Sequence, residues 1–215
     1  LCSALLTLPA LTNVSFEQLD DAGPEEGQSL ESMVKLLQSP VLRGIEFGSV
    51  TFTNTLSQAV AKALKDRSEI TYLNFRQCSF PEGGSAVIAR ALKTNTTLKY
   101  MHYDNACDDN ACDELFCEVL AAALLSNSTL ENLKLSATNS SGSCSWLSTL
   151  FLALQVNNGL KELSINGIKL MDEKLSTALR LGLGNNSTLE TLKLLNIKSG
   201  DNDTCLWREA LSFLY

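Results

Sequence analysis

The sequence contains a single histidine, His102, and a carboxylate follows two residues later at Asp104. Residues two apart in a β-strand point to the same side, so both side chains would face one surface. An imidazole beside a carboxylate is an arrangement used in general acid–base catalysis. The sequence repeat described below would place Asn74 and Lys134 on the two adjacent strands, but it places no serine or cysteine nucleophile there. We therefore expect no catalytic residues, and we expect the chain not to be an enzyme.

A duplicated segment also gathers thiols and carboxylates. Residues 104–108 read Asp-Asn-Ala-Cys-Asp, residues 109–113 repeat the same five, and Cys117 follows. Thiolate metal sites usually use Cys-x-x-Cys pairs, and loops for hard cations alternate oxygen ligands and end in a glutamate. Neither spacing occurs here. The sequence therefore predicts a lengthened loop, with no metal and no other cofactor.

The third kind of chemistry is recognition. Tyrosine and arginine are the residues that most often anchor protein interfaces, because they bury a large area and still form hydrogen bonds. Tyr72, Arg76 and Tyr100 are such residues, and Tyr72 and Tyr100 lie 28 positions apart. If that separation is one structural repeat, the two tyrosines lie side by side on strands roughly 4.8 Å apart.

A repeat of this length runs through the chain. Residues 127–135 return as residues 186–194, and the only difference is that Thr191 stands where the first copy has Asn132. A looser copy occupies residues 95–103. Repeats with a period of 20–50 residues indicate a stacked array. The units begin 28 to 32 residues apart, at Leu11, Leu42, Ile70, Leu98, Leu130, Leu160 and Leu189.

Each unit predicts one strand and one helix. The phrase Leu-x-x-Leu-x-Leu alternates apolar and polar residues, as in a strand buried on one face. Helical patterns follow at about 29–38, 56–65, 84–93, 113–125, 146–156, 171–183 and from 203 onward. Helices are wider than strands, so stacking such units bends the array. We expect a curved α/β solenoid of about seven repeats, with a parallel sheet on the concave face and helices on the convex face.

This pattern resembles the ribonuclease-inhibitor class of leucine-rich repeat, a horseshoe fold also used in NOD-like receptors and in the Ran GTPase activator. The resemblance covers essentially the whole chain. The family usually carries Asn or Cys three places after the last strand leucine, and here only Cys78 fits that slot. It implies a scaffold that binds a protein partner, as part of a larger regulatory or receptor protein. The alternative is a GTPase-activating or other enzyme-regulating protein that acts through strand-end loops, where Arg76 is the only strand-end arginine.

The third, fifth and seventh places of each unit should line the concave face. The richest part of that surface comes from the three central units, and it is our candidate partner-binding site. Its residues are Tyr72, Asn74, Arg76, Tyr100, His102, Asp104, Asn132 and Lys134. The convex helices are the main rival surface.

Charge and composition narrow the partners. With 17 basic and 24 acidic residues the net charge is −7, which argues against nucleic acid. The longest apolar run, 119–125, is too short to span a membrane, which needs about 20 residues. Seven cysteines without paired spacing favour a cytoplasmic protein. Several Asn-x-Ser/Thr triplets keep a secreted or surface-exposed origin open, although those at Asn95, Asn127 and Asn186 share one slot of the repeat and have a structural explanation.

Residues 1–215 are expected to form a single domain. Leu1 lies inside one helical pattern and Tyr215 inside another, and neither end resembles the polar cap that a solenoid needs. We therefore expect a segment of a longer array, with further repeats or subunits covering both edges of the sheet.

Overall fold

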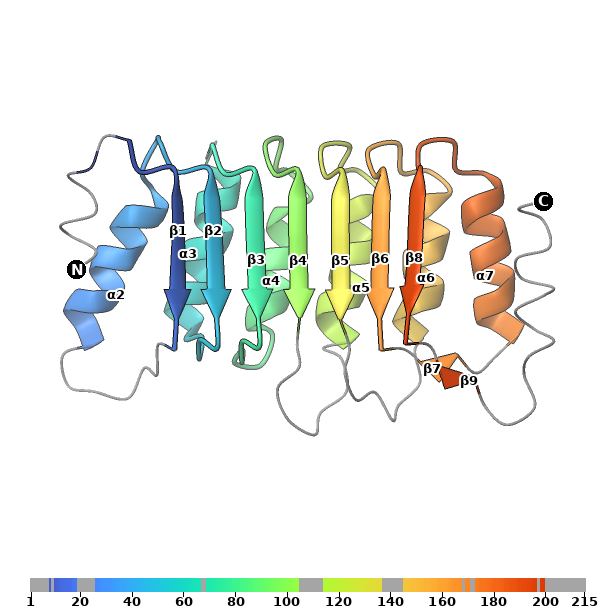
Figure 1. The fold of residues 1–215 in the computed structure, drawn as a ribbon, viewed down its shortest axis with the longest axis horizontal. Helices are drawn as coiled ribbons and strands as arrows, with labels where there is room; N and C mark the ends of the chain where they lie inside the picture. Colours follow the sequence, from blue (N-terminus) through green and yellow to red (C-terminus); the bar gives the residue numbers. More distant parts are fainter. Residues whose placement is uncertain are drawn as a thin grey trace.

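The computed structural model contains a seven-stranded parallel sheet with helices between consecutive strands (Figure 1). It describes residues 8, 10–18, 26–66, 69–104, 114–136, 145–167, 169–170, 173–196 and 198–199. The strands of the sheet are β1 (Asn13–Glu17), β2 (Gly44–Gly48), β3 (Tyr72–Arg76), β4 (Tyr100–Asp104), β5 (Asn132–Ser136), β6 (Glu162–Asn166) and β8 (Thr191–Leu195). The helices are α2 (Glu26–Leu37), α3 (Asn54–Lys65), α4 (Gly84–Ala91), α5 (Glu114–Leu124), α6 (Ser145–Leu154) and α7 (Glu173–Gly184).

The strands lie in chain order, and Figure 1 shows them as one row with α3 to α6 behind it. This confirms the predicted alternation of strand and helix and the parallel sheet, and the arrangement fits a repeat architecture. The helix expected from residue 203 lies outside the described residues. A short second pairing, β7 (Lys169–Leu170) with β9 (Lys198–Ser199), has no counterpart in the sequence-based prediction.

The alternation of side chains sets the two faces of the sheet. The second and fourth residues of β4, Met101 and Tyr103, are buried beneath the helices, whereas the first, third and fifth are partly exposed. We call the sheet surface formed by the first, third and fifth residues of each strand the open face. Strand pairing is in register from β1 to β8, so equivalent residues of successive units align across the whole sheet.

The helices bury their apolar stripes against the inner side of the sheet. In α3, Leu56, Val60 and Leu64 recur at four-residue spacing and are buried. Thr53 caps this helix, since its hydroxyl oxygen accepts a hydrogen bond from the Leu56 N–H at 3.2 Å. Lys65 lies in the last turn, where a positive charge interacts favourably with the helix dipole. Within the described residues, no helix has the length and apolar character needed to cross a membrane.

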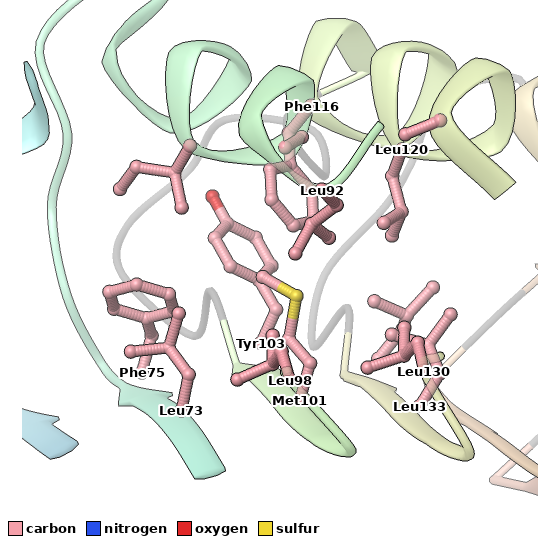
Figure 2. Close-up of a cluster of buried hydrophobic side chains, with 14 of the residues drawn as sticks. Leu73, Phe75, Leu92, Leu98, Met101, Tyr103, Phe116, Leu120, Leu130 and Leu133 are labelled. Carbon is pink, nitrogen blue, oxygen red and sulfur yellow. The ribbon is translucent and has the colours of Figure 1, made fainter. Parts of the chain in front are cut away.

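Aromatic rings run through the core from strand to strand. Phe47 stacks on Phe16 and Phe75, with ring centroids 5.5 and 5.6 Å apart. Figure 2 shows the Tyr103 ring reaching into the same layer among buried leucines, and it stacks on Phe116 of α5 at 3.8 Å. The centre of the array is therefore packed tightly beneath the candidate site.

A ladder of asparagines ties successive units together where α4, α5, α6 and α7 each lead into the next strand, and all but the last of these asparagines are buried. In the Asn127 unit, the side-chain amide donates to the carbonyl oxygens of Leu92, at 2.6 Å, and Asn95, at 3.1 Å, both in the preceding unit. Its oxygen accepts from the backbone N–H groups of Thr129 and Leu130. Each such amide thus satisfies buried backbone groups in two units at once. The ladder consists of Asn95, Asn127, Asn157 and Asn186.

The ladder gives the repeated asparagines their structural role. The structural role predicted for Asn95, Asn127 and Asn186 is confirmed, since each side-chain amide donates to a leucine carbonyl of the preceding unit. Asn157 makes the equivalent hydrogen bonds too, at 2.8 Å to both Leu124 O and Asn127 O, but it was missed because it is not followed by the Ser/Thr of a triplet. Its position three residues before Leu160 was the signal available in the sequence.

Candidate functional site

The strand register brings the eight predicted site residues together on β3, β4 and β5. Across the three strands, the first residues align as Tyr72, Tyr100 and Asn132, the third as Asn74, His102 and Lys134, and the fifth residues of β3 and β4 as Arg76 and Asp104. All eight belong to the open face, as the alternation of the repeat predicted. Asn74 differs from the others, since only 5% of it is exposed.

Two of the four tyrosines of the chain form the centre of this surface. The rings of Tyr72 and Tyr100 are parallel to within 7°, with centroids 4.7 Å apart. This separation matches the distance between neighbouring strands, so strand register alone holds the rings in contact. Lys134 Nζ lies 5.3 Å from the centroid of the Tyr100 ring, which is within the range of a cation–π interaction.

Arg76 is held by two carboxylates. Its Nη2 lies 2.6 Å from Glu17 Oε1 on β1, and its Nε lies 2.8 Å from Glu46 Oε1 on β2. The side chain can cross β2 because Gly48 has none, and a Cβ at position 48 would lie 3.4 Å from Arg76 Nη2. Glu17 and Glu46 were not among the predicted site residues, because neither stood out within its own unit of the repeat. The available signal in the sequence was the pair of glycines in β2, Gly44 and Gly48, which leave room for side chains of β1 and β3 to meet across β2.

His102 and Asp104 share the open face but are not joined by a hydrogen bond in the part of the chain that the structure describes. Burial is the main cause that lowers the pKa of His102, and the positive charges of Lys134 and Arg76 lower it further. Burial also raises the pKa of Asp104, against the opposing effect of His102. No described group donates a hydrogen bond to the buried oxygens Asn74 Oδ1 and Asp104 Oδ1. Such orphaned acceptors are rare in folded proteins and mark a site that needs explanation.

The single histidine makes the electrostatics of this cluster directly measurable. We expect the pKa of His102 in the folded chain, followed by NMR of the imidazole, to lie below its ordinary value of 6.5. Asp104→Asn should lower this pKa further, because the carboxylate raises it, and Lys134→Met should raise it. Because the folded-state pKa lies below the unfolded value, the contribution of neutral His102 to the free energy of unfolding is fully present above pH 6.5. This contribution is lost as the pH falls towards the folded-state pKa. A midpoint at or above 6.5 in the unmodified chain would contradict the observed burial.

The duplicated segment was predicted to form a lengthened loop. All of it except Asp104, namely residues 105–113, lies outside the described residues. Cys117 is described and is buried on α5. Over the ranges that the structure describes, no three His, Cys, Asp or Glu side chains are grouped as metal ligands would be.

A second set of charges borders the candidate site just before the strands begin. Glu131 Oε1 lies 2.8 Å from Lys99 Nζ, and its Oε2 lies 2.9 Å from Lys161 Nζ. Hydrogen bonds from Lys161 and Lys99 lower the pKa of Glu131 to about 2. These charges therefore satisfy one another beside the candidate site.

Comparison with known proteins adds no assignment to this geometry. No protein-family model matches the chain, and no curated protein matches it.

Proposed function

We propose that this chain is a protein-recognition scaffold that binds a macromolecular partner through the open face of β3, β4 and β5. The stacked pair of Tyr72 and Tyr100 is the observation that carries the proposal. Two aromatic rings held parallel by strand register offer a broad apolar surface, and their hydroxyl groups can still form hydrogen bonds. Interfaces concentrate their binding energy on a few such side chains near the centre of the contact.

Polar groups around the tyrosines support the same function. Around the rings lie the partly exposed polar side chains of His102, Asp104 and Lys134. Lys134 offers a positive charge over the Tyr100 ring. A core of aromatic residues surrounded by polar groups is the usual anatomy of a protein interface. The proposal includes a curved leucine-rich-repeat array acting in the cytoplasm within a larger regulatory or receptor protein.

The enzyme-regulating alternative has less support. An arginine that assists phosphoryl transfer must reach the transferring group from the protein surface. The Arg76 guanidinium already contacts Glu17 and Glu46 at 2.6 and 2.8 Å. Using Arg76 in this way would require both ion pairs to break.

The test is a comparison of partner capture by matched variants. Replacing Tyr72 and Tyr100 together by alanine should weaken binding of a captured partner by more than about 2 kcal/mol, or roughly 30-fold. The fold should persist, because neither ring belongs to the buried core. Affinity purification from native lysate with quantitative mass spectrometry identifies the partner, and titration calorimetry with the purified partner measures the loss.

A matched control variant tests whether the partner binds the helices instead of the open face. Leu152 and Val156 are exposed apolar residues in and just after α6, with 44% and 63% of their surfaces accessible. The double variant Leu152→Ser with Val156→Ser should leave partner affinity unchanged. If this variant abolishes binding and the tyrosine variant does not, the partner uses the helices and the proposal is wrong.

A further inference from the structure

A hollow of about 400 Å³ lies on the open face beside the tyrosine pair, and we call it the β2 trough. Gly44 lies in its lining, and the side-chain amide of Asn13 leans over this glycine. A Cβ at position 44 would lie 3.6 Å from Cδ1 of the Tyr72 ring and would collide with Asn13 Oδ1. The trough is lined by Asn13, Val14, Ser15, Gly44, Ile45, Glu46 and Tyr72.

The two ends of the tyrosine stack differ. Tyr72, Tyr100 and Lys134 follow one another across β3, β4 and β5, and the Lys134 ammonium lies over the Tyr100 ring. On the other side of the stack, Tyr72 is aligned with Gly44 in the strand register. The rings are parallel and stack in the direction that joins the strands, so the second face of Tyr72 is turned towards the trough. One aromatic face therefore has a cation, and the equivalent face at the other end borders a hollow.

The trough is also negative. Glu17 and Glu46 share the single guanidinium of Arg76, so this group of three carries a net charge of −1. Glu46 and Tyr72 line the same hollow. Burial raises the pKa of the Tyr72 hydroxyl, and the negative charge of Glu46 raises it further. Asn13 Oδ1 adds a neutral acceptor above Gly44. An aromatic face that borders a hollow lined by carboxylate and amide acceptors suits a flat cation.

We propose that the β2 trough binds an arginine side chain of the protein partner, with its guanidinium flat against Tyr72 and hydrogen-bonded to Glu46. A guanidinium is planar, weakly hydrated and able to stack on an aromatic face while its N–H groups bind a carboxylate, whereas an ammonium is a compact and strongly hydrated charge. The net charge of −7 on the chain favours approach of a basic segment. The inference rests on the proposed function, because the trough adjoins the tyrosine pair that the rest of the partner would cover.

The experiment uses three capped amino acids as probes of the 215-residue chain at constant ionic strength. N-acetyl-arginine amide should cause saturable shifts in the backbone amide NMR signals of Gly44, Glu46 and Tyr72. N-acetyl-citrulline amide has nearly the same shape without the charge and should bind at least about tenfold more weakly. N-acetyl-lysine amide should also bind more weakly than the arginine probe. Absence of saturable shifts with the arginine probe, or equal shifts with arginine and citrulline, overturns the proposal.

Two carboxylate variants locate the binding. Glu46→Gln should weaken the arginine probe at least about fivefold, because the acceptor loses its charge. Glu162→Gln is the matched control, since Glu162 also lies on the open face and also pairs with a cation, Lys193, at 2.6 Å. This variant should leave the probe affinity unchanged. Equal effects of the two variants would mean that the probe senses overall charge, and the assignment to the trough would be wrong.

The test of the arginine site can fail or succeed independently of the test of the proposed function. If the double tyrosine variant loses the partner while the arginine probe fails to bind the unmodified chain, recognition through the open face stands and the arginine site is wrong. If the probe binds at Glu46 while the double tyrosine variant keeps full partner affinity, the trough is a cation site but the partner docks elsewhere. Gly44→Ala provides a further check, because a methyl group in the floor should weaken the arginine probe without removing any charge.

Discussion

Replacing Leu133 by alanine should lower the free energy of unfolding by about 2–5 kcal/mol. Leu133 is fully buried at the centre of β5, between Met101 of β4 and Leu163 of β6. Figure 2 shows it among the side chains that fill the space between sheet and helices. Truncation would remove apolar contacts and leave a cavity, because strands on both sides prevent the site from collapsing. Chemical denaturation followed by circular dichroism measures the loss.

Leu192 gives the comparison for this prediction. It occupies the same place of the repeated phrase, so the repeat predicts that both leucines are buried core residues. In the structure Leu192 is only partly buried, since β8 lies at the margin of the described sheet and pairs with β6 on one side. Leu192→Ala should therefore destabilise the chain less than Leu133→Ala. A negligible loss for both variants would show that the register of the repeat is wrong.

Asn127→Ala is expected to be almost as damaging, with a loss of about 2–4 kcal/mol. Asn127 is 4% exposed and contains no apolar surface of importance, so the expected loss comes from hydrogen bonding. The substitution would leave the carbonyl of Leu92 and the N–H of Leu130 buried without their partner. Buried backbone groups left unpaired cost more than an average hydrogen bond contributes.

Two further variants separate hydrogen bonding from general effects. Asn127→Asp keeps the acceptor oxygen but loses the N–H donor and places a carboxylate among carbonyl oxygens, so it should also destabilise the chain. Asn185→Ala is the control, because its exposed amide donates to Leu181 O four residues earlier in the chain and not to the preceding unit in the described part of the structure. It should change stability by less than about 0.5 kcal/mol. If Asn127→Ala behaves like Asn185→Ala, the ladder does not hold the units together.

The sequence alone determined the repeating strand and helix and the sidedness of each strand. The open-face residues follow from alternation within a strand, which is a local property. For that reason the predicted positions 72, 74 and 76 alternate along β3 with the buried core residues Leu73 and Phe75. The contact between Tyr72 and Tyr100 also followed, because a constant period aligns equivalent residues on adjacent strands.

Only the tertiary structure decided how long or buried polar side chains use that framework. The Arg76 side chain is long enough to adopt several directions. It contacts Glu17, which lies 59 residues away in the sequence, because the space above Gly48 is open to it. The near-complete burial of Asn74 and the trough beside Gly44 likewise depend on how neighbouring side chains lean over a strand. The repeat determines the path of the backbone, because the alternation of apolar and polar residues recurs in each unit. Contacts between side chains of different units depend on the space left by every neighbour, and only the assembled sheet defines that space.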